Sequence, residues 1–184
     1  MLTKLEALGP DGLVPWSYRD GYAREQTAGP ERLRITCSGG HAAVVHTLVA
    51  ELRPPYKLLY VLHTPRGGST PGRYESPALD GPEVSSLFRD FGAFWREDAR
   101  HDVWLHSRED SATIVWDRHD VIYAYGALRR LEAALEAQSI PLTEPVDTPS
   151  PHAHHYHEEW DGAERALVAR FQWRLTPLRP GDEQ

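Results

Sequence analysis

Apolar positions in the first half of the chain repeat with two different periods. Residues 33–37 alternate apolar and polar side chains, which is the period of a half-buried strand. Apolar residues between 42 and 52 then recur at helical spacing until Pro54 and Pro55 end the pattern, and residues 58–62 are continuously apolar or aromatic. The pattern predicts a strand, a helix and a buried strand, joined as a βαβ unit with a right-handed crossover.

The second half of the chain predicts two further helices around an antiparallel meander. Apolar residues between 84 and 95 lie three or four positions apart, as on one face of a helix. Three short segments, 103–106, 112–116 and 121–125, are separated by polar turns and predict neighbouring strands. Leucines at helical spacing then predict a third helix over about 126–138.

The C-terminal part of the chain leaves two structures open. Residues 139–151 contain four prolines and predict an extended connector. The stretch Asp161-Gly162-Ala163-Glu164 fits a capping box that opens a helix, and its Asp-Gly pair also fits a hairpin turn. Because apolar residues alternate strictly from 167 to 175, we predict a hairpin in which residues 152–160 pair with 164–176.

Together these elements predict one α+β domain over residues 1–184. We expect a mixed or mostly antiparallel sheet of about six or seven strands, with three helices packed mainly on one face. The first 32 residues are rich in glycine and proline turns, and we expect them to wrap around the domain.

Composition and charge narrow the function classes. The chain has 20 basic and 27 acidic residues, a formal net charge of -7, so it lacks the cationic surplus that a nucleic-acid groove needs. One cysteine, Cys37, forms no internal disulfide, and no segment approaches the run of about 18 apolar residues that a membrane span needs. Lys4 and Glu6 interrupt the apolar residues among the first eight, so we expect no secretory signal there. We therefore expect a cytoplasmic protein that binds a protein partner and neither nucleic acid nor membrane.

A histidine-rich segment is the densest candidate for chemistry. Four of the ten histidines lie within residues 152–157, followed by two glutamates. Imidazole and carboxylate groups are the usual ligands of Zn, Fe, Mn or Ni, and a site needs three that converge. Because strand side chains alternate, each face would carry two histidines and a glutamate: His152, His154 and Glu158 on one, His155, His157 and Glu159 on the other. The alternatives are a polar strand facing solvent and a pH-sensing surface.

A glycine-containing loop after the buried strand is a second candidate site. In this loop Arg66, Gly67, Gly68 and Arg73 could bind an anion, because glycines allow backbone amides to form a nest and arginine binds phosphate or carboxylate with two N–H groups. The lysine of a P-loop is absent. An ordinary structural turn is the alternative.

Aromatic residues on the predicted meander are a third candidate. Trp104 and Trp116 fall on neighbouring strands and could pair across them. If both lay exposed opposite the helices with Tyr123 or Tyr125, they would form a contact surface for a partner protein.

Two further features carry chemistry-bearing groups. Cys37 falls where a strand meets a helix, a position that can activate a thiol, although a small core residue is the simpler interpretation. The turn Asp117-Arg118-His119-Asp120 holds acids and a base, although charged hairpin turns are commonly only solvated.

The sequence leaves three function classes open. The first is a protein-binding module: an acidic adaptor or inhibitor of a basic partner, including a toxin-neutralising protein. The second is a metal-dependent enzyme of hydrolase type that uses the histidine-rich segment. The third is a small-anion or nucleotide sensor that uses the loop from Arg66 to Arg73. No complete catalytic motif decides among them.

Overall fold

Eight strands form one antiparallel sheet that supports the rest of the fold. In the computed structural model, which describes residues 2–144 and 147–182, every pairing within this sheet is antiparallel. The order across the sheet is β11 (Arg174–Thr176), β6 (Gly72–Glu75), β5 (Tyr56–Leu62), β7 (His101–Ser107), β8 (Ala112–Trp116), β9 (Ile122–Tyr125), β4 (Arg32–Thr36) and β3 (Gly21–Glu25).

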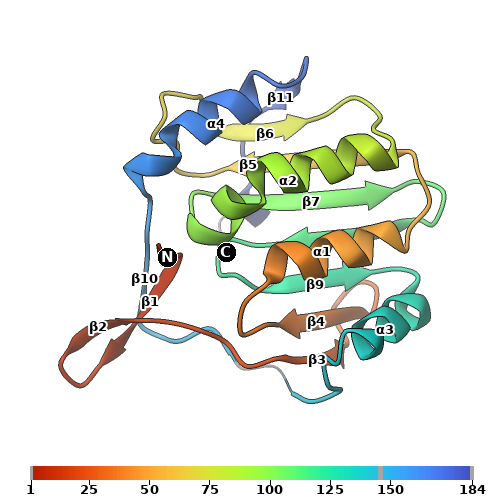
Figure 1. The fold of residues 1–184 in the computed structure, drawn as a ribbon, viewed down its shortest axis with the longest axis horizontal. Coiled ribbons are helices and arrows are strands. Elements are labelled where there is room, and N and C mark those ends of the chain that lie inside the picture. Colours follow the sequence, from red (N-terminus) through yellow and green to blue (C-terminus); the bar gives the residue numbers. More distant parts are fainter. Residues whose placement is uncertain (1, 145–146, 183–184) are drawn as a thin grey trace.

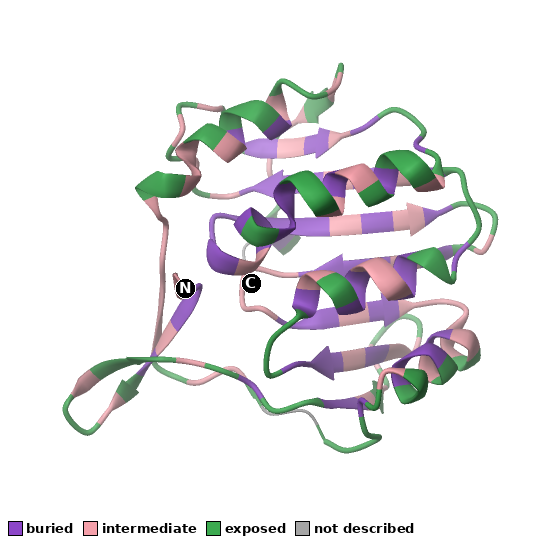
Figure 2. Ribbon diagram, in the orientation of Figure 1, coloured by how far each residue is buried: buried purple, intermediate pink, exposed green. Residues whose placement is uncertain are grey.

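Four α-helices of the described chain cover one face of this sheet (Figure 1). The other face has no α-helix over it in the described residues, and the short 3-10 helix η2 (Pro180–Asp182) lies against it. The four α-helices are α1 (His41–Ala50), α2 (Gly81–Glu97), α3 (Leu128–Ala137) and α4 (Asp161–Val168). The strand segments beneath α1 and α2 are largely buried, and the outer surfaces of the helices are exposed (Figure 2). Within the described ranges, none of the helices combines the length and the apolar character that a bilayer span requires.

Helix α1 connects two strands that run in the same direction but are not neighbours. Four successive antiparallel pairings separate β4 from β5, so the two are parallel, with β7, β8 and β9 between them. The predicted strand, helix and strand therefore form at their expected places, and the meander fills the space between the two strands. Helix α1 lies across the inserted strands on the covered face (Figure 1).

A second sheet of three strands lies beside one end of the large sheet. Its order is β10 (His152–His154), β1 (Leu5–Gly9) and β2 (Gly12–Pro15), and both pairings are antiparallel. Its hairpin β1–β2 projects from the body (Figure 1). Lys4 holds the start of β1 against α2 and the turn after β8, because its ammonium group donates to the carbonyls of Trp95 and Asp117 at 3.2 and 2.9 Å.

The α+β class is confirmed, and the element counts were wrong. The described residues form eleven strands in two sheets and four α-helices, not about six or seven strands with three helices. The expected N-terminal wrap instead supplies β1, β2 and β3, and the loop after β5 supplies β6. These four strands are only four or five residues long. Strands this short show little periodicity among their turn residues. The connector over 139–151 has no helix or strand in its described part, and residues 145–146 lie outside it.

The predicted hairpin of residues 152–160 with 164–176 does not form. Instead β10 is followed by the 3-10 turn η1 (Glu158–Trp160) and α4, and β11 pairs with β6. Leu167 is buried from within the helix, whereas Leu175 is 46 % exposed. Trp173 reaches Tyr74 from the segment between α4 and β11, with ring centroids 5.9 Å apart. The alternation therefore did not mark the two faces of one strand.

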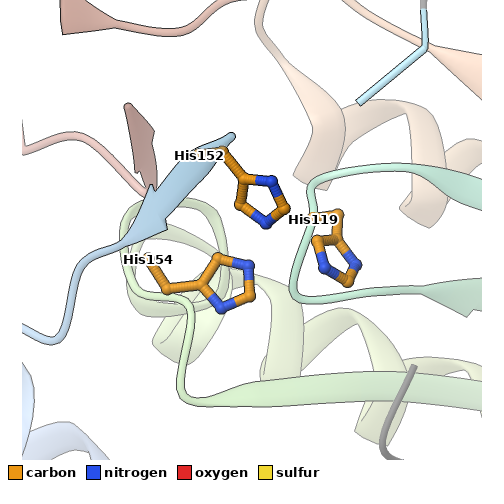
Figure 3. Close-up of side chains that lie close together, drawn as sticks. All are labelled: His119, His152 and His154. Atoms are coloured by element: carbon orange, nitrogen blue, oxygen red, sulfur yellow. The ribbon is translucent and has the colours of Figure 1, made fainter. Parts of the chain in front are cut away.

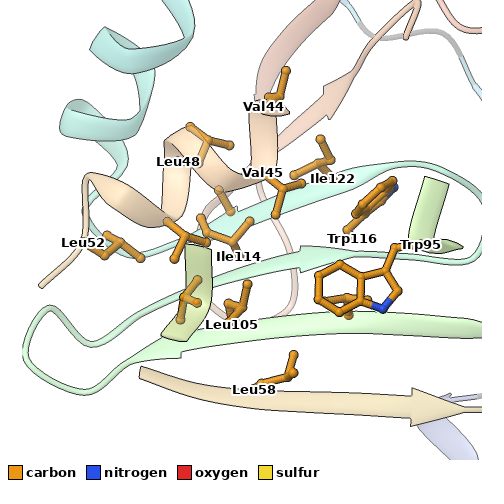
Figure 4. Close-up of a cluster of buried hydrophobic side chains, with 14 of the residues drawn as sticks. Val44, Val45, Leu48, Leu52, Leu58, Trp95, Leu105, Ile114, Trp116 and Ile122 are labelled. Atoms are coloured by element: carbon orange, nitrogen blue, oxygen red, sulfur yellow. The ribbon is translucent and has the colours of Figure 1, made fainter. Parts of the chain in front are cut away.

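The main core lies between the helices and the large sheet. Side chains of α1 and α2 pack on the meander strands and on β5 (Figure 4). The helices contribute Val44, Val45, Leu48 and Trp95, and the strands contribute Leu105, Ile114 and Trp116. Burial of these apolar side chains supplies most of the driving force for the helices to dock.

A buried arginine joins several elements at the edge of this core. Arg100 is fully buried, and its guanidinium group donates to the carboxylates of Asp98, Asp161 and Glu164 at 2.7 to 3.0 Å. It also donates to the carbonyl of His157 at 2.7 Å. The Arg100 cluster, meaning Arg100 with these three acids, links the end of α2 and the start of β7 to α4.

We expect replacement of Arg100 to destabilise the protein strongly. Arg100→Met leaves buried carboxylates without their cation, which costs about 3–5 kcal/mol of the free energy of unfolding. Urea denaturation measures this loss. The matched control is Arg89→Met, because Arg89 forms an exposed ion pair with Asp90, and it should change stability by less than about 0.5 kcal/mol. Equal stability of both variants would contradict the structural role of the Arg100 cluster.

Candidate metal centre

Three histidines from two distant segments converge beside the junction of the two sheets. His119, His152 and His154 each offer a ligand atom, and these atoms lie within 4.8 Å of one another. Their ring centroids are 4.8 to 5.3 Å apart. Two of the rings project from β10 toward the third, which comes from the turn before β9 (Figure 3). We call this group the three-histidine cluster.

Local structure explains why the three side chains meet. Strand β10 pairs with β1 so that His152 lies opposite Ala7 and His154 opposite Leu5, and alternation places both imidazoles on one face of the strand. His119 is held in a tight turn, where the Asp117 carboxylate accepts the backbone N–H groups of His119 and Val121 at 3.0 and 2.8 Å. The small sheet and the turn thus position the ligands independently.

Groups around the cluster fix the orientation of the rings. Nδ1–H of His152 donates to the carbonyl of Pro149 at 2.7 Å, which leaves Nε2 free for a metal. The Asp117 carboxylate lies 3.4 Å from Nδ1 of His119. Nε2 of His154 is shielded from solvent and has no hydrogen-bond partner among the described residues. A buried nitrogen in that state is unfavourable unless a ligand or a proton acceptor reaches it.

The cluster holds a neutral imidazole at physiological pH. Burial lowers the pKa of His154 to about 3, and the nearby His119, Arg118, His152 and Lys4 act in the same direction. A metal binds the unprotonated ring, so this environment removes proton competition at that ligand. Two nitrogens on one Zn²⁺ ion lie roughly 3.3 Å apart, so small side-chain rotations close the cluster around an ion.

The other residues of the histidine-rich segment do not join the cluster. His155 hydrogen-bonds to Glu6 at 2.9 Å, and Nε2–H of His157 donates to the carbonyl of Thr3 at 2.7 Å. Glu158 pairs with Arg66 at the surface, and Glu159 is exposed. The period of the strand therefore placed His152 and His154 together, and it did not indicate the third member of the cluster, His119. Nothing in the spacing links His119 to a segment more than thirty residues later, since their proximity depends on where β10 docks.

The expected anion-binding loop already contains a carboxylate of this chain. Glu164 accepts the backbone N–H groups of Arg66 and Ser69 at 3.0 and 3.3 Å, and a Cβ on Gly67 would lie 2.8 Å from its carboxylate. The side chain of Arg66 contacts Asp161, and Arg73 pairs with Asp182 instead of this loop. Gly68, at φ +90°, provides the turn. The nest therefore fastens α4 to the loop.

The predicted aromatic contact surface is divided between the two faces of the sheet. Trp104, Tyr123 and Tyr125 lie on the face without helices, where they are partly buried. Trp116 is 1 % exposed, packs in the core and donates to Asp120 at 2.7 Å. Trp116 pairs with Val103 and not with Trp104, so strand register separates the two tryptophans.

Cys37 is a core residue in this fold. Its side chain is buried, and burial raises the pKa of the thiol to about 12, with Asp20 and Asp120 adding to the effect. A thiol with this pKa is protonated near neutral pH and is therefore a poor nucleophile.

A cavity of about 130 Å³ lies beside His119, on the face of the sheet without α-helices. His119 lines this cavity together with Asp102, Trp104, Asp117 and Arg118, among others. Trp104 and Tyr125 also line an adjoining, more apolar groove of about 610 Å³. The cluster, the cavity and the groove therefore follow one another across this face. No protein-family model, curated protein or solved structure matches the chain, so the geometry alone carries the functional argument.

We expect the metal-free protein to lose stability on acidification because of His154. The pKa of His154 is near 6.5 in the unfolded state and about 3 in the folded state. Between these pH values the unfolded state binds a proton at His154 and the folded state does not. The free energy of unfolding should therefore decrease as the pH falls from about 6.5 toward 3. Urea titrations across this range should give a shallower pH dependence for His154→Gln than for the wild type.

The partly exposed His46 supplies the control for this measurement. His46→Gln should retain the wild-type pH dependence, since the His46 ring hydrogen-bonds to Ser85 and packs on Phe88, away from the three-histidine cluster. The buried His41 and His101, whose pKa values burial also lowers, leave part of the pH dependence in every variant. Identical slopes for the wild type and His154→Gln would contradict the assignment.

Proposed function

We propose that the protein binds one divalent transition-metal ion, Zn²⁺ above all, through His119, His152 and His154. The observation that supports this most strongly is the convergence of three imidazoles while Nε2 of His154 remains buried and unpartnered. Three imidazoles suit Zn²⁺, Ni²⁺, Fe²⁺ or Cu²⁺, whereas Ca²⁺ and Mg²⁺ prefer oxygen ligands. Among the candidate functions, a metal-dependent one therefore has the most direct geometric support.

We expect about one equivalent of metal per chain after purification without chelator. Elemental analysis identifies the ion, and calorimetric titration of the stripped protein with Zn²⁺ gives the stoichiometry. His119→Gln, His152→Gln and His154→Gln should each abolish tight binding, because two imidazoles do not hold Zn²⁺ firmly. His155→Gln is the matched control and should bind like the wild type, since His155 contacts Glu6 outside the cluster.

Stability provides an independent readout of the same site. An ion that binds only the folded chain at about 100 times its dissociation constant adds about 2.7 kcal/mol to the free energy of unfolding. Zn²⁺ should raise the melting temperature of the wild type and of His155→Gln, and should leave the three ligand variants unchanged. A wild-type protein without bound metal and without a thermal response to Zn²⁺, Ni²⁺ or Fe²⁺ would refute the proposal.

A second candidate function is protein binding through the face of the sheet without helices. It is supported by the groove of about 610 Å³, where Leu59, Trp104 and Tyr125 provide apolar and aromatic walls between polar side chains. Surfaces of this kind are enriched in binding hot spots.

The matched test of this second function compares two truncations. A partner captured by the wild type should be lost with Tyr125→Ala and retained with Leu13→Ala, which alters the exposed hairpin β1–β2. If Tyr125→Ala captured the partner as well as the wild type does, this face would not be the binding surface.

A further inference from the structure

We infer that the metal at the three-histidine cluster keeps one coordination position open to the adjoining cavity, and that it activates a water there to hydrolyse a neutral ester or amide. The inference rests on the proposed metal site. It adds a reaction, a proton acceptor and a substrate class, none of which follows from metal binding itself.

The number of ligands favours an open site. Structural zinc sites are closed by four protein ligands, whereas catalytic sites have three and a water. The group that converges among the described residues has three members. Asp117, the acid that contacts His119, is itself held in the turn by two backbone N–H groups. Since His119 belongs to the cluster and also lines the cavity, a fourth ligand can approach from the cavity side.

A carboxylate is positioned in the same cavity to accept a proton. Asp102 projects from β7, and its side chain is 12 % exposed. One oxygen accepts the backbone N–H of Arg118 at 2.8 Å, and the other lies 3.0 Å from Nε2 of the buried His63. Arg118 directly precedes His119 in the chain, so the first of these bonds ties Asp102 to the turn that presents a metal ligand. His63 and Arg118 fix the orientation of the carboxylate, and each oxygen retains a further lone pair.

The reaction follows from these positions. A water on the metal gives a proton to a carboxylate oxygen of Asp102, and the water oxygen forms a bond to the carbonyl carbon of the substrate. The bond from that carbon to the leaving oxygen or nitrogen then breaks, and the leaving group takes the proton from Asp102. One water is consumed, and an acid and an alcohol or amine are formed.

The walls of the cavity indicate a neutral substrate with an apolar part. Three carboxylates, those of Asp102, Asp117 and Asp182, line the cavity together with two arginines, Arg32 and Arg118. The acids outnumber the arginines, so the cavity has no cationic surplus that would attract an anion. Its volume of about 130 Å³ suits a small acyl group. Trp104 and Tyr125 continue into the larger groove, where an aromatic or aliphatic portion can pack.

The first experiment tests the open coordination position without any substrate. Azide added to the Co²⁺-loaded protein should change its visible absorption spectrum in a saturable manner, because azide replaces the water. Asp102→Asn should bind Co²⁺ equally and should bind azide at least about threefold more tightly, since a nearby negative charge is removed. Asp90→Asn removes a carboxylate on α2, on the covered side of the sheet. This control variant should bind Co²⁺ and azide as tightly as the wild type.

The second experiment measures hydrolysis of p-nitrophenyl acetate by the Zn²⁺-loaded protein. The wild type should hydrolyse the ester faster than His119→Gln. The kcat of Asp102→Asn should be about 100-fold lower than that of the wild type, while the variant retains its metal. Asp90→Asn should retain full activity. The anionic probe bis(p-nitrophenyl) phosphate should react more slowly than the ester, and the reverse order would overturn the substrate class.

These outcomes separate the two proposals. If the protein binds no metal, the proposed function is refuted. A protein that binds metal but shows no azide response, or whose Asp102→Asn variant keeps wild-type hydrolysis and azide affinity, retains the metal site and overturns the inference drawn here.

Discussion

The rest of this structure depends on one buried ion cluster, in which Arg100 lies among Asp98, Asp161 and Glu164. Charges removed from water are tolerated only when each has a partner, so the four side chains must assemble together. Asp98 also accepts the backbone N–H of His157 at 2.7 Å, while Arg100 donates to the carbonyl of the same residue. The cluster thereby fixes the segment that leads from β10 to α4, and it holds the loop after β5 through Glu164.

The convergence of the three histidines is a consequence of that attachment. His157 is fixed by the cluster, and two residues earlier the backbone of His155 is also held. Its carbonyl accepts from the N–H of Ala99 and its N–H donates to the carbonyl of Lys4, each at 3.0 Å. These bonds place β10 beside β1. This places His152 and His154 opposite the turn that carries His119. Two parts of the chain that share no regular pairing therefore meet through side chains, and an ion between them would join the small sheet to the large one.

The elements that could be predicted from the sequence share one physical property. Helices α1, α2 and α3 and strands β4, β5, β7, β8 and β9 each bury one side or both, so their apolar positions repeat with the period of the backbone. Strands β1, β2, β3 and β6 are short and were missed, and β11 was expected to pair with residues 152–160 but pairs with β6. Helix α4 was mistaken for a strand because apolar residues alternate from 167 to 175, although Glu164 also fitted a capping box that opens a helix. In the structure Glu164 is a buried acid of this helix. Its burial depends on Arg100, which lies more than sixty positions away in the chain.

The sequence by itself determined the class of the fold, the central strands, the first three helices and the pairing of His152 with His154 on one strand face, because these depend on local periodicity. Only the tertiary structure decided that His119 completes the group, that Trp116 lies in the core while Trp104 does not, and that the glycine loop is filled by Glu164. Each of these depends on strand register or on the docking of distant segments. Such contacts are selected by packing and charge pairing across the whole molecule, and no local pattern records them.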